Sequence, residues 1–273
     1  MFQYVLCYSM LINVVNMPFD KGANQEGSSK AYKALKDDLN YLKISKTFNV
    51  ENTINNHYRT ILGEGFLACW EILNSNNFPL LIGGDHSCAV SSIFASNDHC
   101  NMNKEKLGVL WFDAHTDFNT MQTSPTGNIH GVPVSILCGH TLPMLIFGEL
   151  LDPSQFLYYG IRDIDSLEFM RFQEYNMNSI DYNSLIDFQL LELQKWIQKY
   201  DKIHLSFDMD CFDANDFQSV NTPVPNGPKK KDIMKLINVI KESEKLISMD
   251  LVEYNPTINK NNTLIIELLN NIF

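Results

Sequence analysis

Basic side chains are scarce in this chain. Lys and Arg number 21 among 273 residues, against 32 Asp and Glu, which gives a formal net charge of -11 at pH 7. Nucleic acids and anionic membranes attract clusters of basic side chains, so neither is expected as the main partner. The acidic balance agrees with a cationic substrate or with metal ions, although an acidic composition by itself is common.

Cysteine motifs are absent as well. The six cysteines, no two of which have Cys-x-x-Cys spacing, are Cys7, Cys69, Cys88, Cys100, Cys138 and Cys211. Close cysteine pairs typify zinc and redox sites, and disulfide frameworks are typical of small secreted chains. We therefore expect reduced thiols, most of them buried.

Long uninterrupted apolar runs are also missing. Residues 1–19 are largely apolar, but polar side chains such as Ser9 and Asn13 break the run, and no basic flank precedes it. A membrane span needs about 20 consecutive apolar residues, and a signal peptide needs a basic segment before its apolar part. The sequence therefore predicts a buried first strand over residues 4–15 and a cytoplasmic protein.

Strands and helices are expected to alternate along the chain. The further expected strands are 78–82, 107–112, 155–161, 203–207 and 246–252. The expected helices are 52–76, 86–95, 165–175, 182–200, 231–243 and 263–272. Another helix, capped at Ser28 or Ser29, would carry Tyr32, Leu35, Leu39 and Leu42 on one face. This alternation is typical of a parallel sheet covered on both faces, so we expect one three-layer α/β/α domain over residues 1–273 with a mainly parallel sheet.

Three clusters of acidic and histidine residues directly follow expected strands. They are Gly83-Gly-Asp-His-Ser87, Asp113-Ala-His-Thr-Asp117 and Asp208-Met-Asp-Cys-Phe-Asp213. In parallel sheets the ligand site lies beyond the carboxyl ends of the strands. All three clusters fall at those ends, so we expect them to form one site.

The chemistry of these clusters favours a pair of metal ions. The candidate ligands are His86, Asp113, His115, Asp117, Asp208 and Asp210. Oxygen-rich ligation with some nitrogen suits Mn²⁺ better than Zn²⁺, Fe²⁺, Co²⁺ or Ni²⁺. Six ligands are too many for one ion with an open position, whereas two ions that share bridging carboxylates fit, and they would lower the pKa of a shared water. A lone aspartate at a strand end is more often a helix cap, but three such clusters together favour the metal site.

The same three segments resemble the metal motifs of the ureohydrolases, a superfamily that includes arginase and agmatinase. The motif residues are Gly83-Gly-Asp-His-Ser87, Asp113-Ala-His-Thr-Asp117 and Ser206-Phe-Asp-Met-Asp210, and the resemblance runs in order from about residue 18 to 256. It implies a three-layer α/β fold with two Mn²⁺ ions. One ion would be held by His86, Asp113, Asp117 and Asp208, and the other by Asp113, His115, Asp208 and Asp210, with Asp113 and Asp208 bridging.

A loop between the motifs resembles the arginase branch of this superfamily. Its segments are Asp117-Phe-Asn119-Thr and Thr126-Gly-Asn-Ile-His130-Gly. In arginases this loop binds the substrate α-carboxylate, a role that the resemblance gives to Asn119 and Thr126, although arginases usually carry Ser where Thr126 stands. His130 matches the proton-shuttle histidine; without the resemblance it would be taken for a structural loop histidine.

Two later segments resemble further parts of the arginase pocket. Gly160-Ile-Arg-Asp-Ile-Asp165-Ser-Leu-Glu168 is similar to the segment that contacts the substrate α-amino group, which implies that role for Asp165 and Glu168. Thr222 and Glu253 match positions that line the guanidinium pocket, with Glu253 as the ion-pair partner. Without the resemblance, Asp165 would be a helix cap and Glu168 and Glu253 surface carboxylates. Asn221 departs from the family pattern, since arginases usually have Gly there.

The resemblance implies hydrolysis of L-arginine to L-ornithine and urea by a hydroxide that bridges the metal ions. Glu253 would hold the guanidinium, while Asp117 and His130 would move protons. It also implies a homo-oligomer, a trimer or a hexamer. Two alternatives stay open: another ureohydrolase that acts on agmatine or a related guanidino acid, and a non-catalytic homologue that regulates a partner. A metal-dependent deacetylase of related topology is disfavoured, because the ligands of the second metal are present.

Overall fold

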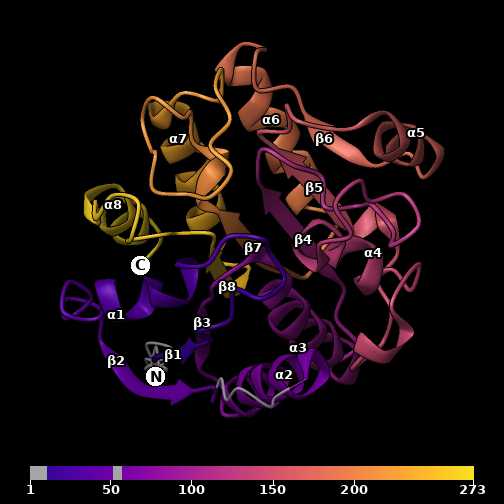
Figure 1. Ribbon diagram of the computed structural model, residues 1–273. Coiled ribbons are helices and arrows are strands. Elements are labelled where there is room, and N and C mark those ends of the chain that lie inside the picture. Colours follow the sequence, from indigo (N-terminus) through magenta and orange to yellow (C-terminus); the bar gives the residue numbers. More distant parts are fainter. Residues whose placement is uncertain (1–10, 52–56) are drawn as a thin grey trace, which may run out of the picture.

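A computed structural model describes residues 11–51 and 57–273 of the chain, and it has one eight-stranded sheet (Figure 1). The strands are β1 (Ile12–Asn16), β2 (Ile44–Asn49), β3 (Phe78–Ile82), β4 (Leu107–Phe112), β5 (Phe156–Tyr159), β6 (Asn178–Ile180), β7 (Lys202–Asp208) and β8 (Leu246–Val252). Their order is β2-β1-β3-β8-β7-β4-β5-β6, and every neighbouring pair is parallel. The carboxyl ends of all these strands therefore lie at one edge.

Helices cover both faces of the sheet. They are α1 (Ala31–Leu35), α2 (Tyr58–Asn74), α3 (Ala89–Met102), α4 (Pro133–Leu137), α5 (Ser166–Glu174), α6 (Ile186–Ile197), α7 (Lys230–Glu242) and α8 (Thr263–Ile272). Figure 1 shows α1, α6, α7 and α8 on one face, and α2, α3 and α4 on the other. This is the α/β/α arrangement that the sequence predicts, and the prediction of a three-layer fold is confirmed.

Two apolar cores separate the sheet from its helices. Leu205 and Phe207 of β7 belong to the core beneath α6, α7 and α8, and both are fully buried. The second core lies between the sheet and α2, α3 and α4. Alternate residues of a strand point to opposite faces, so His204 and Ser206 face this second core, where they too are fully buried. The central strands thus carry polar side chains on one face only.

The edges of the sheet differ most from the prediction. The expected helix after Ser29 ends at Leu35, although Leu39 and Leu42 are buried as expected, and β2 follows it without having been predicted. β2 and the three-residue β6 pair on one side only. An edge strand is covered on one side only and can carry more polar residues. The residues of β2 are partly or largely exposed, and neither β2 nor β6 has a clear apolar pattern. The short α4 was also missed.

Several element boundaries are shifted from the predicted ones. β1 begins at Ile12 and α2 at Tyr58, and the rest of the predicted segments at 4–10 and 52–56 lies outside the described residues. The helix expected over 86–95 is a short 3-10 turn at His86–Cys88 followed by α3, which runs on to Met102. These shifts leave the three polar clusters at the strand ends unchanged.

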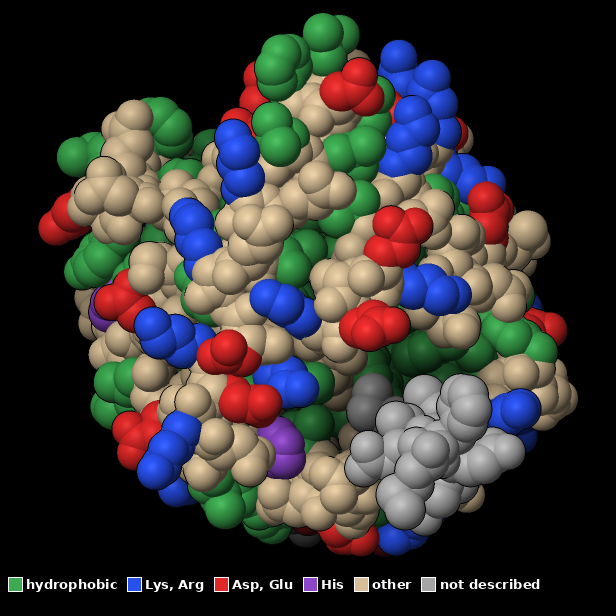
Figure 2. Space-filling model, turned by 180° about the vertical axis from the view of Figure 1, so that it is seen from behind, with side chains coloured by type: hydrophobic (Ala, Val, Ile, Leu, Met, Phe, Trp, Pro, Cys, Tyr) green, Lys and Arg blue, Asp and Glu red, His purple; other side chains and the backbone are tan. Residues whose placement is uncertain are grey.

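The cysteines and the surface agree with the composition. Cys69, Cys88, Cys100, Cys138 and Cys211 are free and buried, whereas Cys7 lies outside the described residues. Charged side chains of both signs are interspersed over the face seen in Figure 2. Among the described segments, no helix has the length and apolar character that crossing a membrane would require.

A close crossing of two loops lies at the carboxyl edge of the sheet. A Cβ atom on Gly84 would lie 1.7 Å from the carbonyl oxygen of Phe19. The Asp85 N–H donates to that same oxygen at 2.9 Å, and the Glu253 N–H donates to the Gly84 oxygen at 2.8 Å. Only glycine fits at position 84, because the Phe19 carbonyl occupies the space of a side chain. The hydrogen bonds around Gly84 join the loops that follow β1, β3 and β8.

We expect Gly84→Ala to destabilise the protein by at least about 2 kcal/mol, because the added methyl group must push backbone atoms apart. Gly131→Ala is the matched control, since a Cβ there would meet no atom within 4 Å. Urea unfolding of both variants measures the difference. Equal free energies of unfolding for Gly84→Ala and Gly131→Ala would contradict the close approach of Gly84 to Phe19.

Candidate metal centre

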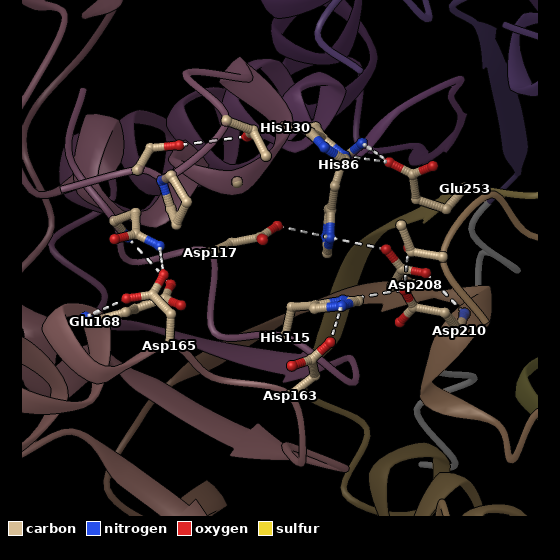
Figure 3. A pocket seen from close by; sticks show the side chains of 16 residues that line it. His86, His115, Asp117, His130, Asp163, Asp165, Glu168, Asp208, Asp210 and Glu253 are labelled. Carbon is tan, nitrogen blue, oxygen red and sulfur yellow. Dashed lines mark hydrogen bonds and ion pairs between the residues drawn. The ribbon is translucent and has the colours of Figure 1, made fainter. Parts of the chain in front are cut away.

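The loops after β3, β4 and β7 bring the predicted ligands together (Figure 3). Short turns aim their side chains inward. The Asp85 carboxylate accepts the Ser87 N–H at 3.0 Å, which begins the turn that holds His86. Similarly, Asp208 accepts the Asp210 N–H at 2.7 Å, and Asp113 accepts the His115 N–H at 2.7 Å.

The first ligand group is centred on Nδ1 of His86. This nitrogen lies 2.9 Å from Asp113 Oδ2, 3.2 Å from Asp117 Oδ2 and 3.2 Å from Asp208 Oδ2. It is buried and has no hydrogen-bond partner. His86, Asp113 and Asp208 each offer a ligand atom within 4.8 Å of the other two. A bare nitrogen among three carboxylates fits a divalent cation.

The second ligand group consists of Asp113, His115 and Asp210. His115 Nδ1 lies 3.1 Å from Asp210 Oδ2 and 3.4 Å from Asp113 Oδ1. Asp113 therefore belongs to both groups and turns one oxygen toward each, which is the geometry of a bridging carboxylate. Asp208 belongs to the first group, and Asp117 approaches that group beside His86.

Burial shifts the pKa values of Asp117, Asp208 and Asp210 upward, whereas His115 and His86 hold the pKa of the buried Asp113 below its usual range. Burial and the neighbouring Asp113 carboxylate raise the pKa of Asp117 to about 6. Burial, Asp210 and Asp113 hold the pKa of Asp208 well above its usual range. Several buried carboxylates with so few cationic partners are costly unless cations neutralise them, so the site has the electrostatics of a cation site.

A cavity of about 260 Å³ opens above these ligands. Every predicted site residue except the more deeply buried Asp113 lines it, which includes His130, Asp165, Glu168 and Thr222. Four further lining residues, not singled out in the sequence, are Ser124, Pro125, Gly131 and Asp163. The volume lies somewhat below the roughly 300–1,000 Å³ of drug-sized pockets and suits a ligand of amino-acid size.

One end of the cavity is formed by the loop after β4 and the start of α5. The Asn119 amide donates to Asp165 Oδ2 at 2.8 Å, and Asp165 caps α5 by accepting the backbone N–H groups of Leu167 and Glu168. Glu168 Oε1 accepts the backbone N–H groups of Phe118 and Asn119 at 2.7 and 3.1 Å. Burial raises the pKa of Glu168 to about 7.

Thr126 lines the cavity and is exposed to solvent. Its hydroxyl accepts the Asn128 N–H at 3.2 Å. Its position leaves the hydroxyl accessible to a ligand that enters from solvent.

Glu253 lies toward the opposite end of the cavity, beside His86 (Figure 3). Its Oε1 accepts the His86 N–H at 3.0 Å and pairs with His130 Nδ1 at 3.2 Å, while its Oε2 is buried without a partner. The residue has a φ of +61°, a left-handed conformation that is uncommon outside glycine and is often found at functional sites. Glu253 lines the cavity, and its unpaired buried carboxylate oxygen fits a cationic donor group.

Thr222 and Asn221 belong to the loop before α7, and Thr222 lines the cavity. The Thr222 hydroxyl donates to Asp210 Oδ2 at 3.2 Å. The Asn221 amide donates to the Gln25 carbonyl at 3.2 Å and accepts from the Asn255 amide at 2.6 Å. Asn221, which stands where arginases usually have Gly, thus joins the loops after β1 and β8.

The structure also shows supporting residues that the sequence reading missed. The Trp111 Nε1–H donates to Asp113 Oδ2 at 2.9 Å, and its ring stacks on His86 with centroids 4.1 Å apart. Asp163 Oδ2 lies 3.6 Å from His115 Nε2. Both residues could have been found from the sequence. Trp111 lies two positions before Asp113, and Asp163 lies two positions before Asp165, so in an extended segment each points the same way as a predicted site residue.

Comparison with known proteins identifies the family. A model of the arginase family matches residues 11–272. The chain belongs to the arginase family. An arginase of Staphylococcus aureus (strain MRSA252) is 33% identical over 198 residues, which cover 70% of this chain and 64% of that relative. The chain thus spans less than two thirds of this relative in the alignment.

Two longer matches extend the likeness to arginase-family proteins. The arginase of Bacillus subtilis (strain 168) is 28% identical over 278 residues, which cover 92% of each chain. The crystal structure of Entamoeba histolytica arginase in complex with L-ornithine superimposes with a TM-score of 0.88 at 27% identity, over 97% of this chain and 99% of that one. The fold of this arginase-family member is therefore shared over nearly its whole length.

The His130–Glu253 pair should titrate at high pH. Burial alone would lower the pKa of His130, but the Glu253 carboxylate raises it to about 9. We expect an NMR titration of the metal-free protein to find this value and Glu253→Gln to lower it, because the carboxylate charge favours the protonated ring. His99, outside the cavity, is the control and should titrate identically in both proteins. An unchanged His130 pKa in the variant would contradict the pairing.

The same pair makes stability depend on pH. The pKa of His130 in the folded chain exceeds the usual value of about 6.5. Its contribution to the free energy of unfolding is therefore fully present below about pH 6.5 and lost as the pH rises through 9. Wild type and Glu253→Gln should differ more in urea unfolding near pH 6 than near pH 10.

Proposed function

We propose that the protein hydrolyses L-arginine to L-ornithine and urea with the help of two Mn²⁺ ions. The observation that carries this proposal is the unpaired Oε2 of Glu253, buried beside two candidate ligand groups in one cavity. A guanidinium group offers donors for that oxygen and a carbon for attack. The Entamoeba histolytica structure, in which arginase is bound to L-ornithine, supports an amino-acid product in such a cavity.

The residues present fit the metals. His86, Asp113, Asp117 and Asp208 would hold one ion, and Asp113, His115, Asp208 and Asp210 the other. Two divalent cations bound there would lower the pKa of a water in the cavity, so that hydroxide would be available near neutral pH. The oxygen-rich donor set favours Mn²⁺ among the transition metals.

Protein groups at the two ends of the cavity orient the substrate. Glu253 accepts hydrogen bonds from the guanidinium, and Thr222 lines the same end. The second amide hydrogen of Asn119 and the Thr126 hydroxyl donate to the α-carboxylate. Asp165 and Glu168 accept from the α-ammonium group.

Proton transfer falls to Asp117 and His130. The Asp117 carboxylate faces the ligand groups and the open cavity, where it can accept a proton from the attacking water and return it to the leaving amine. His130 keeps a proton at Nδ1 beside Glu253 near neutral pH. Its ring is partly exposed at the rim, so it exchanges protons between solvent and the cavity.

We also propose that the chain forms one domain over residues 1–273, is cytoplasmic, and assembles as a trimer or hexamer. The uninterrupted family match over residues 11–272 supports the first point. The composition and the resemblance to arginases support the others. The acidic net charge supports a small cationic substrate over a nucleic acid or a membrane.

Urea release by purified protein with added Mn²⁺, across a panel of guanidino compounds, tests the proposed reaction. We expect arginine to be preferred over agmatine and guanidino acids. Agmatine lacks the α-carboxylate, so a preference for agmatine would assign the protein to another ureohydrolase activity. No bound metal together with no urea from any compound would favour a non-catalytic homologue.

His115 belongs only to the second ligand group, so His115→Asn should remove one of two bound ions. Loss of a residue that only supports a metal ligand typically lowers activity roughly 10–100-fold. His115 would be a ligand itself, so turnover should fall by at least that factor. Metal analysis and urea assays measure the two effects, and thermal unfolding shows whether the chain stays folded. His99→Asn is the control. Undiminished urea release by His115→Asn would contradict the assignment.

Asn119→Ala tests the carboxylate site. A hydrogen bond to a charged group contributes about 1.5–3 kcal/mol, so the KM for arginine should rise about tenfold or more. The KM for agmatine, which has no carboxylate, should change much less. Equal effects on both substrates would remove the carboxylate-binding role.

A further inference from the structure

A network of buried polar side chains lies behind His86, between β7, β8 and α3. Its members are Ser92, Ser96, His204, Ser206, Ser248 and Asp250, and each is at most 1% exposed. None of them lines the cavity. Figure 1 shows β7 and β8 side by side with α3 on one face. The proposed reaction gives these residues no role.

Asp250 is the centre of the network. Its Oδ1 accepts from the Ser206 hydroxyl at 2.6 Å, and its Oδ2 accepts from the Ser92 hydroxyl at 2.8 Å. His204 Nε2 lies 2.7 Å from the same Oδ2. Three close partners with donor capacity indicate an ionised carboxylate, which has no proton to give, so Ser206 and His204 are the donors.

The polarity of this network determines the tautomer of His86. Ser206 has a single hydroxyl proton, and it donates that proton to Asp250. Its oxygen must therefore accept the hydrogen bond from His86 Nε2, which lies 2.9 Å away. Nε2 then carries the ring hydrogen, and in the neutral imidazole Nδ1 keeps a free lone pair. Nδ1 is the nitrogen that faces Asp113, Asp117 and Asp208.

Two contacts together hold the imidazole. Stacking on Trp111, with the rings inclined by 12°, restrains the plane of the ring. The hydrogen bond to Ser206 restrains rotation within that plane. Partners of this kind, behind a metal-bound histidine, commonly contribute 10–100-fold in metal affinity.

We propose that Asp250, acting through Ser206, is a positioning residue that fixes the orientation and tautomer of His86 and thereby strengthens cation binding at the group formed by His86, Asp113 and Asp208. This inference rests on the proposed dinuclear site. It gives the network a function at the metal centre, although none of its members touches the cavity.

Ser248 offers a matched control within the same network. Its hydroxyl lies 2.8 Å from His204 Nδ1 and 2.7 Å from the Ser96 hydroxyl. It is as deeply buried as Ser206, but the hydrogen-bonded path from Ser248 to His86 runs through His204, Asp250 and Ser206. Ser248→Ala and Ser206→Ala therefore remove the same atom from equally buried positions, and only the second breaks the link to His86.

The test measures Mn²⁺ affinity of the purified protein by competition with a chelating dye, and the bound-ion environment by electron paramagnetic resonance. We expect Ser206→Ala to weaken one of two sites by about 10–100-fold, and Ser248→Ala to leave both affinities unchanged. Thermal unfolding should show similar losses of stability in the two variants. If Ser206→Ala does not fold, Asp250→Asn, which removes the charge and keeps the shape, should show the same loss at one site.

The outcomes separate this inference from the proposed function. Two ions in the wild type with unchanged affinity in Ser206→Ala, or in Asp250→Asn where that variant is used, would overturn the positioning role alone. Equal weakening in Ser206→Ala and Ser248→Ala would also overturn it, because the network would then be only structural. A wild type that binds no Mn²⁺ would overturn both proposals.

Discussion

The repulsion among buried carboxylates is the constraint on which the site depends. Asp113, Asp117, Asp208 and Asp210 are each at most 6% exposed and lie at one edge of the sheet. Their charges are taken out of water, and the two histidines among them offer too little positive charge to balance them. The fold holds them in place with turns, close loop crossings and buried hydrogen bonds. The two divalent cations proposed for this site would offset the repulsion, and the repulsion would in turn strengthen their binding.

The surroundings of the carboxylates are built in layers. Backbone N–H groups hold Asp113 and Asp208, and the Trp111 indole fixes one oxygen of Asp113. The close approach of Gly84 to Phe19 ties the loop that carries His86 to the loop after β1. Glu253 completes the cavity from the end of β8 with a left-handed backbone. These parts come from β1, β3, β4, β7 and β8 at their carboxyl ends, so the parallel sheet is what brings them together.

Much of this site could be predicted from sequence, because its ligands have local patterns. Asp113, His115 and Asp117 alternate directly after an apolar strand, and this spacing can be recognised without knowing the order of the strands in the sheet. The role proposed for Asp250 could not be predicted, because it depends on β8 lying beside β7 and on α3 covering both. β2 and β6 were missed since edge strands lack a marked apolar pattern. Asp163 lies within a segment that resembles the arginase pocket, but only the structure shows that its carboxylate lies beside His115.

The pairing of β7 with β8 has a consequence for folding. Ser206 is the direct neighbour of Asp250 across the two strands, and His204 is that of Ser248. If β8 slipped by one residue, Asp250 would turn to the opposite face, into the apolar core beneath α6, α7 and α8, where an unpaired carboxylate is costly. The hydrogen bonds that hold His86 thus also penalise misaligned strands. A slip in the register of the central sheet would therefore also remove the support of His86, a candidate metal ligand.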